Sequence, residues 1–255
     1  MLAWLSGGVD GFSWRRVAGV FMRPQPVTIP MVMLFAIIPF YLYIGVITRG
    51  RVTHVPELAL DRAIPMEASW SLVYLSLFLA ALLPVFVVHQ QELVRRTIAA
   101  FLAIWLVAYA CFLAYPTAGP RHGEVFGEDF STWALKTIHS SDVPYNCFPS
   151  LHVAQCFLAA LVCYRVHRGV GGVALVWACL VGLSTLFTKQ HYIADVVAGA
   201  FLGCTGAHLF LRTYPRQTTP ESERRLAPVL ALGAVGTYGI MIAIMWLAYE
   251  SGVVI

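Results

Sequence analysis

Seven apolar segments, each separated from the next by a polar loop, run along the chain. They cover residues 27–48, 69–89, 95–115, 149–167, 171–188, 191–211 and 227–249. One helical crossing of a bilayer needs about 17–25 predominantly apolar residues, so each segment is long enough to span a membrane. The pattern therefore predicts an all-α fold, a polytopic membrane helix bundle of six helices followed by a seventh, C-terminal span.

Three polar segments have a pattern of their own. Residues 1–26 combine aromatic and basic side chains, which is typical of a segment that lies on a membrane surface. Residues 56–64 begin with Pro56 and stop before Pro65, which favours a short surface helix. In residues 128–138 apolar side chains recur at helical spacing. We expect a helix there in the outer interface, either as a lid or only as an anchor for its loop.

The composition agrees with an integral membrane protein. The chain has 255 residues, of which 59% are hydrophobic and 12% charged, whereas soluble domains carry about 25% charged residues. The net charge of +4 would suggest a nucleic-acid partner in a soluble chain, but here the positive-inside rule accounts for it. The six cysteines form no C-x-x-C pair, so we expect free thiols and neither a disulfide framework nor a zinc site.

The distribution of Lys and Arg predicts how the chain crosses the membrane. With the N-terminus inside, the inner loops hold eleven of these residues and the outer loops six. That bias favours an N-terminus inside and a C-terminus outside. It brings three loops to the outer face of the membrane, which we expect to be the plasma membrane or bacterial inner membrane. These loops contain Arg121, residues 145–152 and residues 189–191.

The turn between the fifth and sixth segments carries three ionisable residues within seven positions: Lys189, His191 and Asp195. Ionisable groups are costly in a bilayer, which makes such a cluster a functional candidate. If residues 191–195 are helical, His191 and Asp195 lie one turn apart on one face. The carboxylate would then hold one ring nitrogen of the histidine and direct the other outward.

Two further loops add groups to the same face. Pro149 and Ser150 precede a long apolar helix, whose N-terminus offers unpaired amides and a positive dipole end to an anion. His152 lies in the first turn of that helix, and Arg121 and Lys189 add cations from neighbouring loops. An oxyanion with two or more charges, most simply a phosphate, fits this set of groups. Arg121, Lys189 and Ser150 are therefore the predicted substrate-binding residues.

The two histidines can divide the chemistry of phosphate transfer. His191, oriented by Asp195, is the predicted nucleophile, so the first step would form a phosphohistidine. His152 would act as general acid on the leaving oxygen and then as base for the acceptor. Cationic side chains and amides supply the positive charge that a metal ion supplies elsewhere. We therefore expect neither a metal nor another cofactor.

Two of these stretches resemble known motifs. Residues 149–152, Pro-Ser-Leu-His, and residues 191–195, His-x-x-x-Asp, are similar to the second and third motifs of the type 2 phosphatidic acid phosphatase superfamily. The forms Phe-Pro-Ser-Leu-His and Lys-Gln-His-Tyr resemble its inositol phosphorylceramide synthase-like branch more closely. The resemblance covers residues 115–199 and implies a six-helix phosphatase-like core, to which the seventh span is an addition.

The chain departs from the usual motifs at three places. Leu151 stands where the second motif has Gly, and Thr185 replaces the Arg of the Ser-Arg pair that opens the third motif. The first motif has a Lys six residues ahead of Arg-Pro, which is absent here, so only Arg121 is available for it. Lys189 is the natural substitute for the Arg that the third motif lacks.

The resemblance implies a membrane phosphatase or phosphotransferase that acts on a lipid phosphate, diphosphate or phosphodiester. Two enzymatic alternatives stay open. In a hydrolase, water attacks the phosphohistidine; in a transferase, a lipid hydroxyl does so, as in inositol phosphorylceramide or sphingomyelin synthases. A third alternative is a non-enzymatic lipid carrier or scaffold. The expected partners are a lipid phosphate substrate and membrane lipids but no nucleic acid, and the oligomeric state stays open.

These expectations divide the chain into three parts. Residues 1–26 form a basic interfacial segment, residues 27–212 a catalytic membrane core, and residues 213–255 an inner loop with the extra membrane helix. Outside the predicted site, His208 lies thirteen positions after Asp195, about 220° round an ideal helix. We therefore expect His208 to face away from the site.

Overall fold

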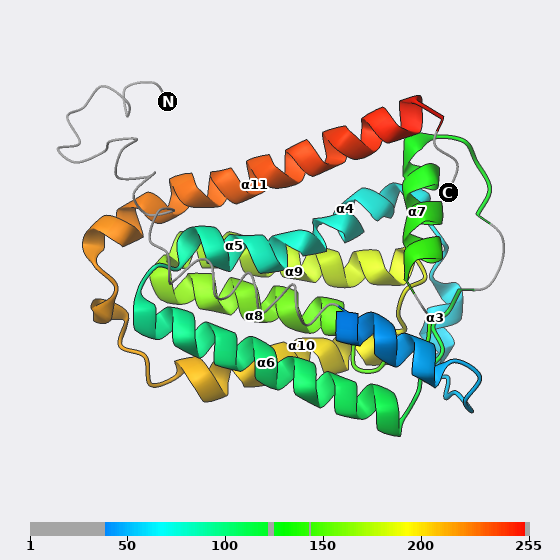
Figure 1. Cartoon of the computed structure of the whole chain (residues 1–255), viewed down its shortest axis with the longest axis horizontal. Coiled ribbons are helices and arrows are strands. Elements are labelled where there is room, and N and C mark those ends of the chain that lie inside the picture. The colour runs from blue at the N-terminus through cyan, green and yellow to red at the C-terminus, as the bar shows by residue number, and fades with distance from the viewer. Residues whose placement is uncertain (1–38, 122–124, 143, 253–255) are drawn as a thin grey trace.

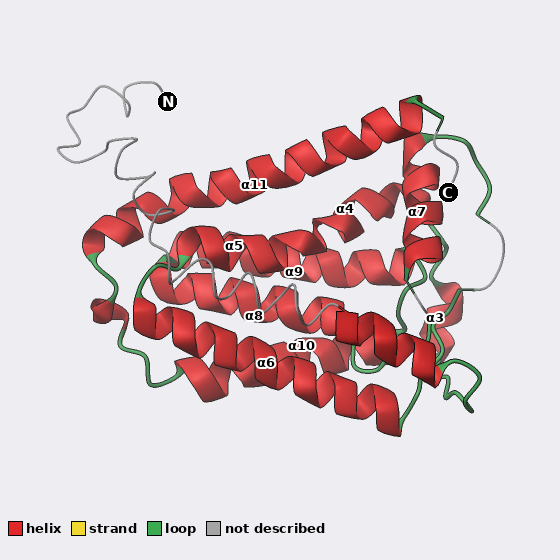
Figure 2. Ribbon diagram, in the orientation of Figure 1, coloured by secondary structure: helices red, strands yellow, loops and turns green. Residues whose placement is uncertain are grey.

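The structure is a computed structural model of the chain, and it describes residues 39–121, 125–142 and 144–252. Within these ranges the chain forms helices and loops and no sheet (Figure 2). The long helices gather into one bundle (Figure 1). The predicted fold class is confirmed. The predicted segment 1–26 and the first part of the predicted span 27–48 lie outside the described residues.

Five helices in the described part of the chain are long and apolar enough to cross a membrane. They are the broken helix Ala68–Val87, α6 (Gln91–Ala114), α9 (Arg168–Phe187), α10 (Ile193–Leu211) and α11 (Glu221–Glu250). Two shorter apolar helices, Pro39–Thr48 and α8 (Leu151–Val166), lie within the remaining predicted spans. Each predicted segment therefore contains an observed helix, and α11 is the predicted seventh.

The helix Ala68–Val87 consists of four consecutive pieces, η1 (Ala68–Trp70), α4 (Ser71–Leu75), η2 (Ser76–Phe78) and α5 (Leu79–Val87). The tighter piece η2 begins at Ser76, whose hydroxyl donates to the carbonyl of Val73 (2.5 Å) and accepts from the indole N–H of Trp177 (2.9 Å). A serine that bonds back to its own helix tends to bend it. This local change of helical pitch separates α4, the first part of the segment, from α5.

The central helix of the bundle is α8, which packs against α9 and α10 and also contacts α5 and α6 (Figure 1). Ten of its sixteen residues are buried. A helix that neighbours cover on all sides is apolar all round, as the sequence of α8 is. Because protein rather than lipid surrounds α8, it does not need the full length of a lipid-exposed span.

Two glycines allow α10 to touch the backbone of α8. A Cβ atom at Gly199 would lie 2.3 Å from the carbonyl oxygen of Ser150, and one at Gly203 would lie 2.3 Å from that of Ala154. Small residues four positions apart are a common means of close helix packing in membranes. The contact fixes the start of α8 against the start of α10.

The helix predicted at residues 128–138 is confirmed as α7 (Phe130–Ser141), which lies across the ends of the bundle helices (Figure 1), while its place in the outer interface stays a prediction. Asp129 caps it, since its carboxylate accepts from the amides of Ser131 (2.9 Å) and Thr132 (3.1 Å). The apolar positions that predicted the helix are buried at Phe130, Ala134 and Ile138.

The C-terminal end of α11 holds the beginning of α7. The Tyr249 hydroxyl donates to the carbonyl of Glu128 (2.8 Å), and the rings of Trp246 and Phe130 lie 4.9 Å apart. Edge-to-face aromatic pairs of this kind stabilise beyond the area they bury. The added helix is therefore an anchor for α7, while the lid role of α7 stays a prediction.

We predict that Gly199→Ala lowers the stability of the purified protein, because the new methyl group would overlap the Ser150 carbonyl. Overpacking of this kind costs about 1–3 kcal/mol, which thermal unfolding in detergent would register as a lower melting temperature. The matched control is Gly236→Ala in α11, where a Cβ atom meets nothing within 4 Å, so stability should stay equal or rise slightly. Equal melting temperatures of the two variants would contradict this account of the α8–α10 contact.

Candidate active site

Loops that are distant in sequence meet at one end of the bundle. The amide of His54 donates to the carbonyl of Pro116 (2.8 Å), and the amide of Gly119 donates to that of Pro144 (2.9 Å). Such backbone bonds fix the loops against one another. The amide of Ser150 in turn donates to the carbonyl of Asp195 (3.0 Å), so the three predicted loops lie at the same end of the molecule: residues 115–121, 145–152 and 188–195.

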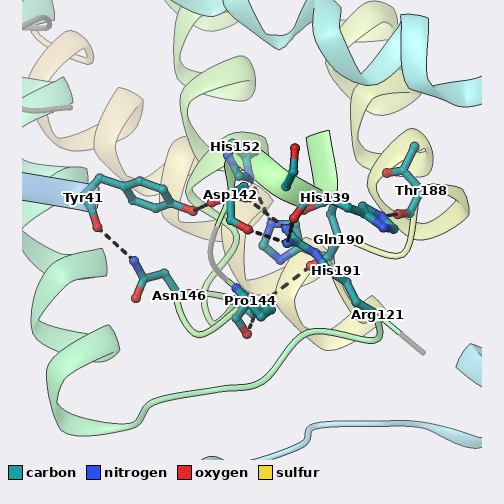
Figure 3. A network of polar contacts seen from close by, with 12 residues as sticks. Tyr41, Arg121, His139, Asp142, Pro144, Asn146, His152, Thr188, Gln190 and His191 are labelled. Carbon is teal, nitrogen blue, oxygen red and sulfur yellow. Dashed lines mark hydrogen bonds and ion pairs between the residues drawn. The ribbon is translucent and has the colours of Figure 1, made fainter. Parts of the chain in front are cut away.

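His152, His191 and Asp195 form a row. Nδ1 of His152 lies 3.1 Å from Nε2 of His191 (Figure 3). Nδ1 of His191 lies 3.4 Å from Oδ2 of Asp195. The carboxylate favours a proton on Nδ1 of His191, which leaves Nε2 as the nitrogen with a free lone pair. The 3.4 Å separation is long for a hydrogen bond, but such contacts often tighten only when substrate binds. The predicted catalytic residues are thus in one place.

The local structure around His191 differs from the expectation in one respect. Residues 191–195 are not one helical turn, because α10 begins at Ile193 and His191 lies in the preceding loop. Asp195 instead reaches back over the helix start, where its carboxylate accepts from the amide of Tyr192 (2.9 Å). The helical premise was wrong, and a helix cap, rather than helical periodicity, sets the contact between His191 and Asp195.

Ser150 is fully buried at the start of α8. Its hydroxyl accepts from the amide of Val153 (3.4 Å) as a helix cap, and its own amide donates to the carbonyl of Asp195 (3.0 Å). From the sequence we expected the amides at the start of α8 to bind an anion. The amide of Ser150 instead donates a hydrogen bond that joins α8 to α10. Ser150 therefore positions the two histidine-bearing segments, while phosphate binding by its hydroxyl stays a prediction.

Arg121 lies inside a ring of acceptors. Its guanidinium donates to the carbonyls of His139 (3.1 Å) and Asp142, to the carboxylate of Asp142 (3.3 Å), and to the side-chain oxygen of Gln190 (Figure 3). Sequence reasoning assigned no role to Asp142 or Gln190. A partly buried arginine requires an opposite charge, and that requirement is the signal that would have pointed to Asp142.

Lys189 has a backbone conformation that glycine adopts more easily. Its φ angle is +55°, in the left-handed region where a side chain is strained. The amides of Lys189 and Gln190 donate to the carbonyls of Leu186 (3.2 Å) and Thr185 (2.9 Å), which together form the motif that ends α9. Glycine would be unstrained at this position of the motif, so the presence of a lysine indicates that its side chain has a function.

The Lys189 side chain lies beside His191 in the wall of a pocket. The pocket encloses about 160 Å³, part of it open to solvent, and is lined by Asp61, Ile64, Pro120, Leu186, Lys189, His191 and Tyr192. Nζ of Lys189 donates to the carbonyls of Ile64 (2.6 Å) and Asp61 (3.5 Å). The structure thus places this cation next to the candidate nucleophile, and its phosphate contact stays a prediction.

Asp61 is a buried carboxylate that sequence reasoning missed. The predicted surface helix 56–64 is shortened to α3 (Ala59–Ala63), and Asp61 within it is buried rather than on the surface. Its carboxylate accepts from the amides of Leu58 (2.7 Å) and Ile193 (2.9 Å). Because Asp61 accepts from the amide of Ile193 at the start of α10, it anchors the loop around α3 to the segment that carries His191.

Two tyrosines surround His152. The rings of Tyr41 and Tyr74 lie 6.1 and 5.6 Å from the His152 ring in edge-to-face arrangements, and the Tyr41 hydroxyl donates to Asp142 (3.0 Å; Figure 3). Both tyrosines lie within apolar helices, so their sequence context resembles that of ordinary core residues. Their packing restricts how the His152 ring can turn.

His139 joins α7 to the turn after α9. Its Nε2 lies 2.8 Å from the carbonyl of Thr188 (Figure 3), so Nε2 carries the proton. Burial lowers the pKa of His139, the hydrogen bond to Thr188 opposes that shift, and the nearby Arg121 adds to it. His139 is therefore neutral at pH 7 and acts here as a hydrogen-bond donor.

Cys147 lies in the loop that precedes Ser150 and His152, but it is not set up as a nucleophile. Burial raises the pKa of Cys147 well above its usual value, and the carboxylates of Asp195 and Asp142 raise it further, so the thiol stays protonated.

Within residues 39–121, 125–142 and 144–252, no three His, Cys, Asp or Glu side chains form a cluster that could hold a metal ion.

Comparisons with known proteins agree with the motifs. A family model described as the PAP2 superfamily matches residues 52–209, which is more than half of the chain. The bacitracin transport permease protein BcrC of Bacillus licheniformis is 37% identical over 71 residues, 28% of this chain and 35% of that protein. A PA-phosphatase related-family protein of Dictyostelium discoideum is 22% identical over 147 residues, 53% of this chain and 26% of that protein.

The match spans only about a third or less of the length of each of these relatives. No solved structure matches the chain. The family match includes both histidines, Asp195 and Arg121, while α11 lies beyond it. This chain belongs to the PAP2 superfamily.

Proposed function

We propose that this protein is a membrane lipid phosphatase that hydrolyses a lipid phosphate or diphosphate through a phosphohistidine on His191. The observation that carries the proposal is the row of His152, His191 and Asp195, with separations of 3.1 and 3.4 Å, in a chain of the PAP2 superfamily. Such a row supplies an acid, a nucleophile and an orienting carboxylate. These are the groups that cleavage of a phosphate ester needs.

In the first step the lipid phosphate enters between the two imidazoles and separates them. Nε2 of His191 attacks phosphorus, a P–N bond forms and the P–O bond to the lipid breaks. His152, in its protonated form, gives its proton to the leaving lipid oxygen. Asp195 stabilises the positive charge that develops on His191, and Arg121 and Lys189 balance the charge of the phosphate.

In the second step His152 takes a proton from water while the water oxygen attacks phosphorus and the P–N bond breaks. Inorganic phosphate leaves, His152 is again protonated and His191 is again neutral. Both histidines return to their starting protonation states, so water is the one co-reactant consumed. The burial of His191, which is 3% exposed, supports this scheme because it strengthens every charge interaction in the site.

The second candidate is a phosphotransferase, in which a lipid hydroxyl replaces water in the second step. It is favoured by the residues 148–152, Phe-Pro-Ser-Leu-His, and 189–192, Lys-Gln-His-Tyr, which resemble the inositol phosphorylceramide synthase-like branch. The same histidine pair serves both reactions. The choice between the two depends on which acceptor reaches the phosphohistidine.

We also propose that the site faces the outside of a plasma membrane or bacterial inner membrane. The loops between α5 and α6, α8 and α9, and α10 and α11 lie at the end of the bundle opposite the site (Figure 1). Under the positive-inside rule this end faces the cytoplasm. The arginines at this end are Arg95, Arg96, Arg165, Arg168, Arg212, Arg216, Arg224 and Arg225.

We predict that His191→Ala abolishes phosphate release from lipid phosphates and that His152→Ala slows it about 10²–10⁴-fold, the usual contribution of a general acid. Purified protein is assayed for inorganic phosphate with and without an alcohol acceptor; release without the acceptor supports a hydrolase.

His208→Ala, on the exposed face of α10, is the control and should leave the rate unchanged. Unchanged phosphate release in His191→Ala would show that His191 is not the nucleophile. No release by the wild-type protein would favour a non-enzymatic carrier, which is closer to the name of the Bacillus licheniformis relative, a transport permease protein.

The orientation predicts opposite accessibility for cysteines at the two ends of the bundle. Val52, 84% exposed, lies in the loop before His54 at the site end, and Gln217 lies in η3 (Arg216–Thr218) at the other end. Val52→Cys should react with a membrane-impermeant maleimide on intact cells, and Gln217→Cys only after the membrane is opened. The unaltered chain controls for the native cysteines. The reverse pattern would show that the site faces inward.

A further inference from the structure

Five buried polar atoms in the loops of the candidate active site have no hydrogen-bond partner within the described residues. They are Nε of Arg121, Oδ1 of Asn146, Nε2 of Gln190, Nδ1 of His191 and Oδ1 of Asp195. Nδ1 of His191 already lies 3.4 Å from Oδ2 of Asp195, so this atom faces an acceptor. The two donors on Arg121 and Gln190 have no such neighbour, and buried donors without an acceptor are rare in folded proteins.

The orientation of the Gln190 amide follows from chemistry. Arginine can only donate hydrogen bonds, so the atom of Gln190 that faces the Arg121 guanidinium must be the oxygen, Oε1. The amide nitrogen, with two N–H groups, therefore points elsewhere. Gln190 is 2% exposed, so bulk water does not satisfy these groups.

The side-chain donors of Lys189 and Thr185 already have acceptors within the protein. Nζ of Lys189 binds the carbonyls of Asp61 and Ile64, and the Thr185 hydroxyl donates to the carbonyl of Gly182 within α9 (2.7 Å). Arg121 likewise uses its two terminal nitrogens on protein acceptors. Among these side chains, the donors left over are therefore the N–H of Arg121 Nε and the amide of Gln190, on two side chains that hydrogen-bond to each other.

We propose that Gln190 is a phosphate-binding residue, which donates from Nε2 to a non-bridging oxygen of the substrate phosphate beside Nε of Arg121. Gln190 directly precedes His191, and the two side chains lie together with Arg121 (Figure 3). An oxyanion is the ligand that two adjacent unpaired donors require. The inference rests on the proposed function, because it assigns a role within the same site.

A positioning role for Gln190 gives a different expectation. If Gln190 only holds Arg121 through Oε1, then Gln190→Glu keeps that acceptor and strengthens it, whereas Gln190→Met removes it. If Gln190 donates to phosphate, both variants lose the donor. Comparing the two substitutions therefore separates donation to phosphate from support of Arg121.

The test is the affinity of the full-length protein in detergent for inorganic phosphate, measured by calorimetry and independent of turnover. Gln190→Glu and Gln190→Met should each raise the Kd for phosphate about tenfold or more, as expected for the loss of a hydrogen bond to a charged ligand. The control is Gln217→Glu. Gln217 is exposed in η3 at the opposite end of the bundle, so the Kd should change less than twofold.

Weaker binding in Gln190→Met alone would overturn the proposal in favour of a positioning role. Weaker binding in Gln190→Glu alone would overturn it in favour of charge repulsion, and unchanged binding in both would leave Gln190 without a role in phosphate binding. A wild-type protein that neither binds phosphate nor releases it from lipids would instead overturn the proposed function itself. These outcomes are distinguishable because wild-type binding and turnover are measured in the same preparation.

Discussion

The hydrogen bond from the Ser150 amide to the Asp195 carbonyl, 3.0 Å long, ties the first turn of α8 to that of α10. It forms where Gly199 lets the two helix backbones meet. His152 follows Ser150 by two residues, and His191 precedes Asp195 by four. One backbone contact therefore sets the distance between the two histidines, of which His152 lies in α8 and His191 in the loop before α10.

The charges around this contact are balanced within the protein. Arg121 faces the carboxylate of Asp142, and Asp61 and Asp195 each accept from backbone amides at the start of α10. A buried charge without a partner would cost several kcal/mol. The balance keeps the side chains in fixed positions before substrate arrives, which is the arrangement that electrostatic stabilisation of a transition state requires.

The sequence was sufficient to predict the all-α membrane bundle, because apolar periodicity is a local signal. Costly ionisable groups also singled out His152, His191 and Asp195, which the structure brings together and whose catalytic roles stay predictions. The sequence did not identify Asp61 or Gln190. Their roles arise only when loops that are distant in sequence dock on the turn between α9 and α10, and no local pattern encodes that docking. The same reason explains the wrong helical premise at residues 191–195, where a cap from Asp195 decides the geometry.

The central claim is that Asp195 holds Nδ1 of His191 and leaves Nε2 to attack phosphorus. The most direct measurement is to quench the purified protein at alkaline pH during turnover and to locate the phosphoryl group by mass spectrometry and phosphorus NMR. The account predicts one phosphorylated residue, His191, modified at Nε2. A phosphoryl group on His152, or on Nδ1 of His191, would contradict it.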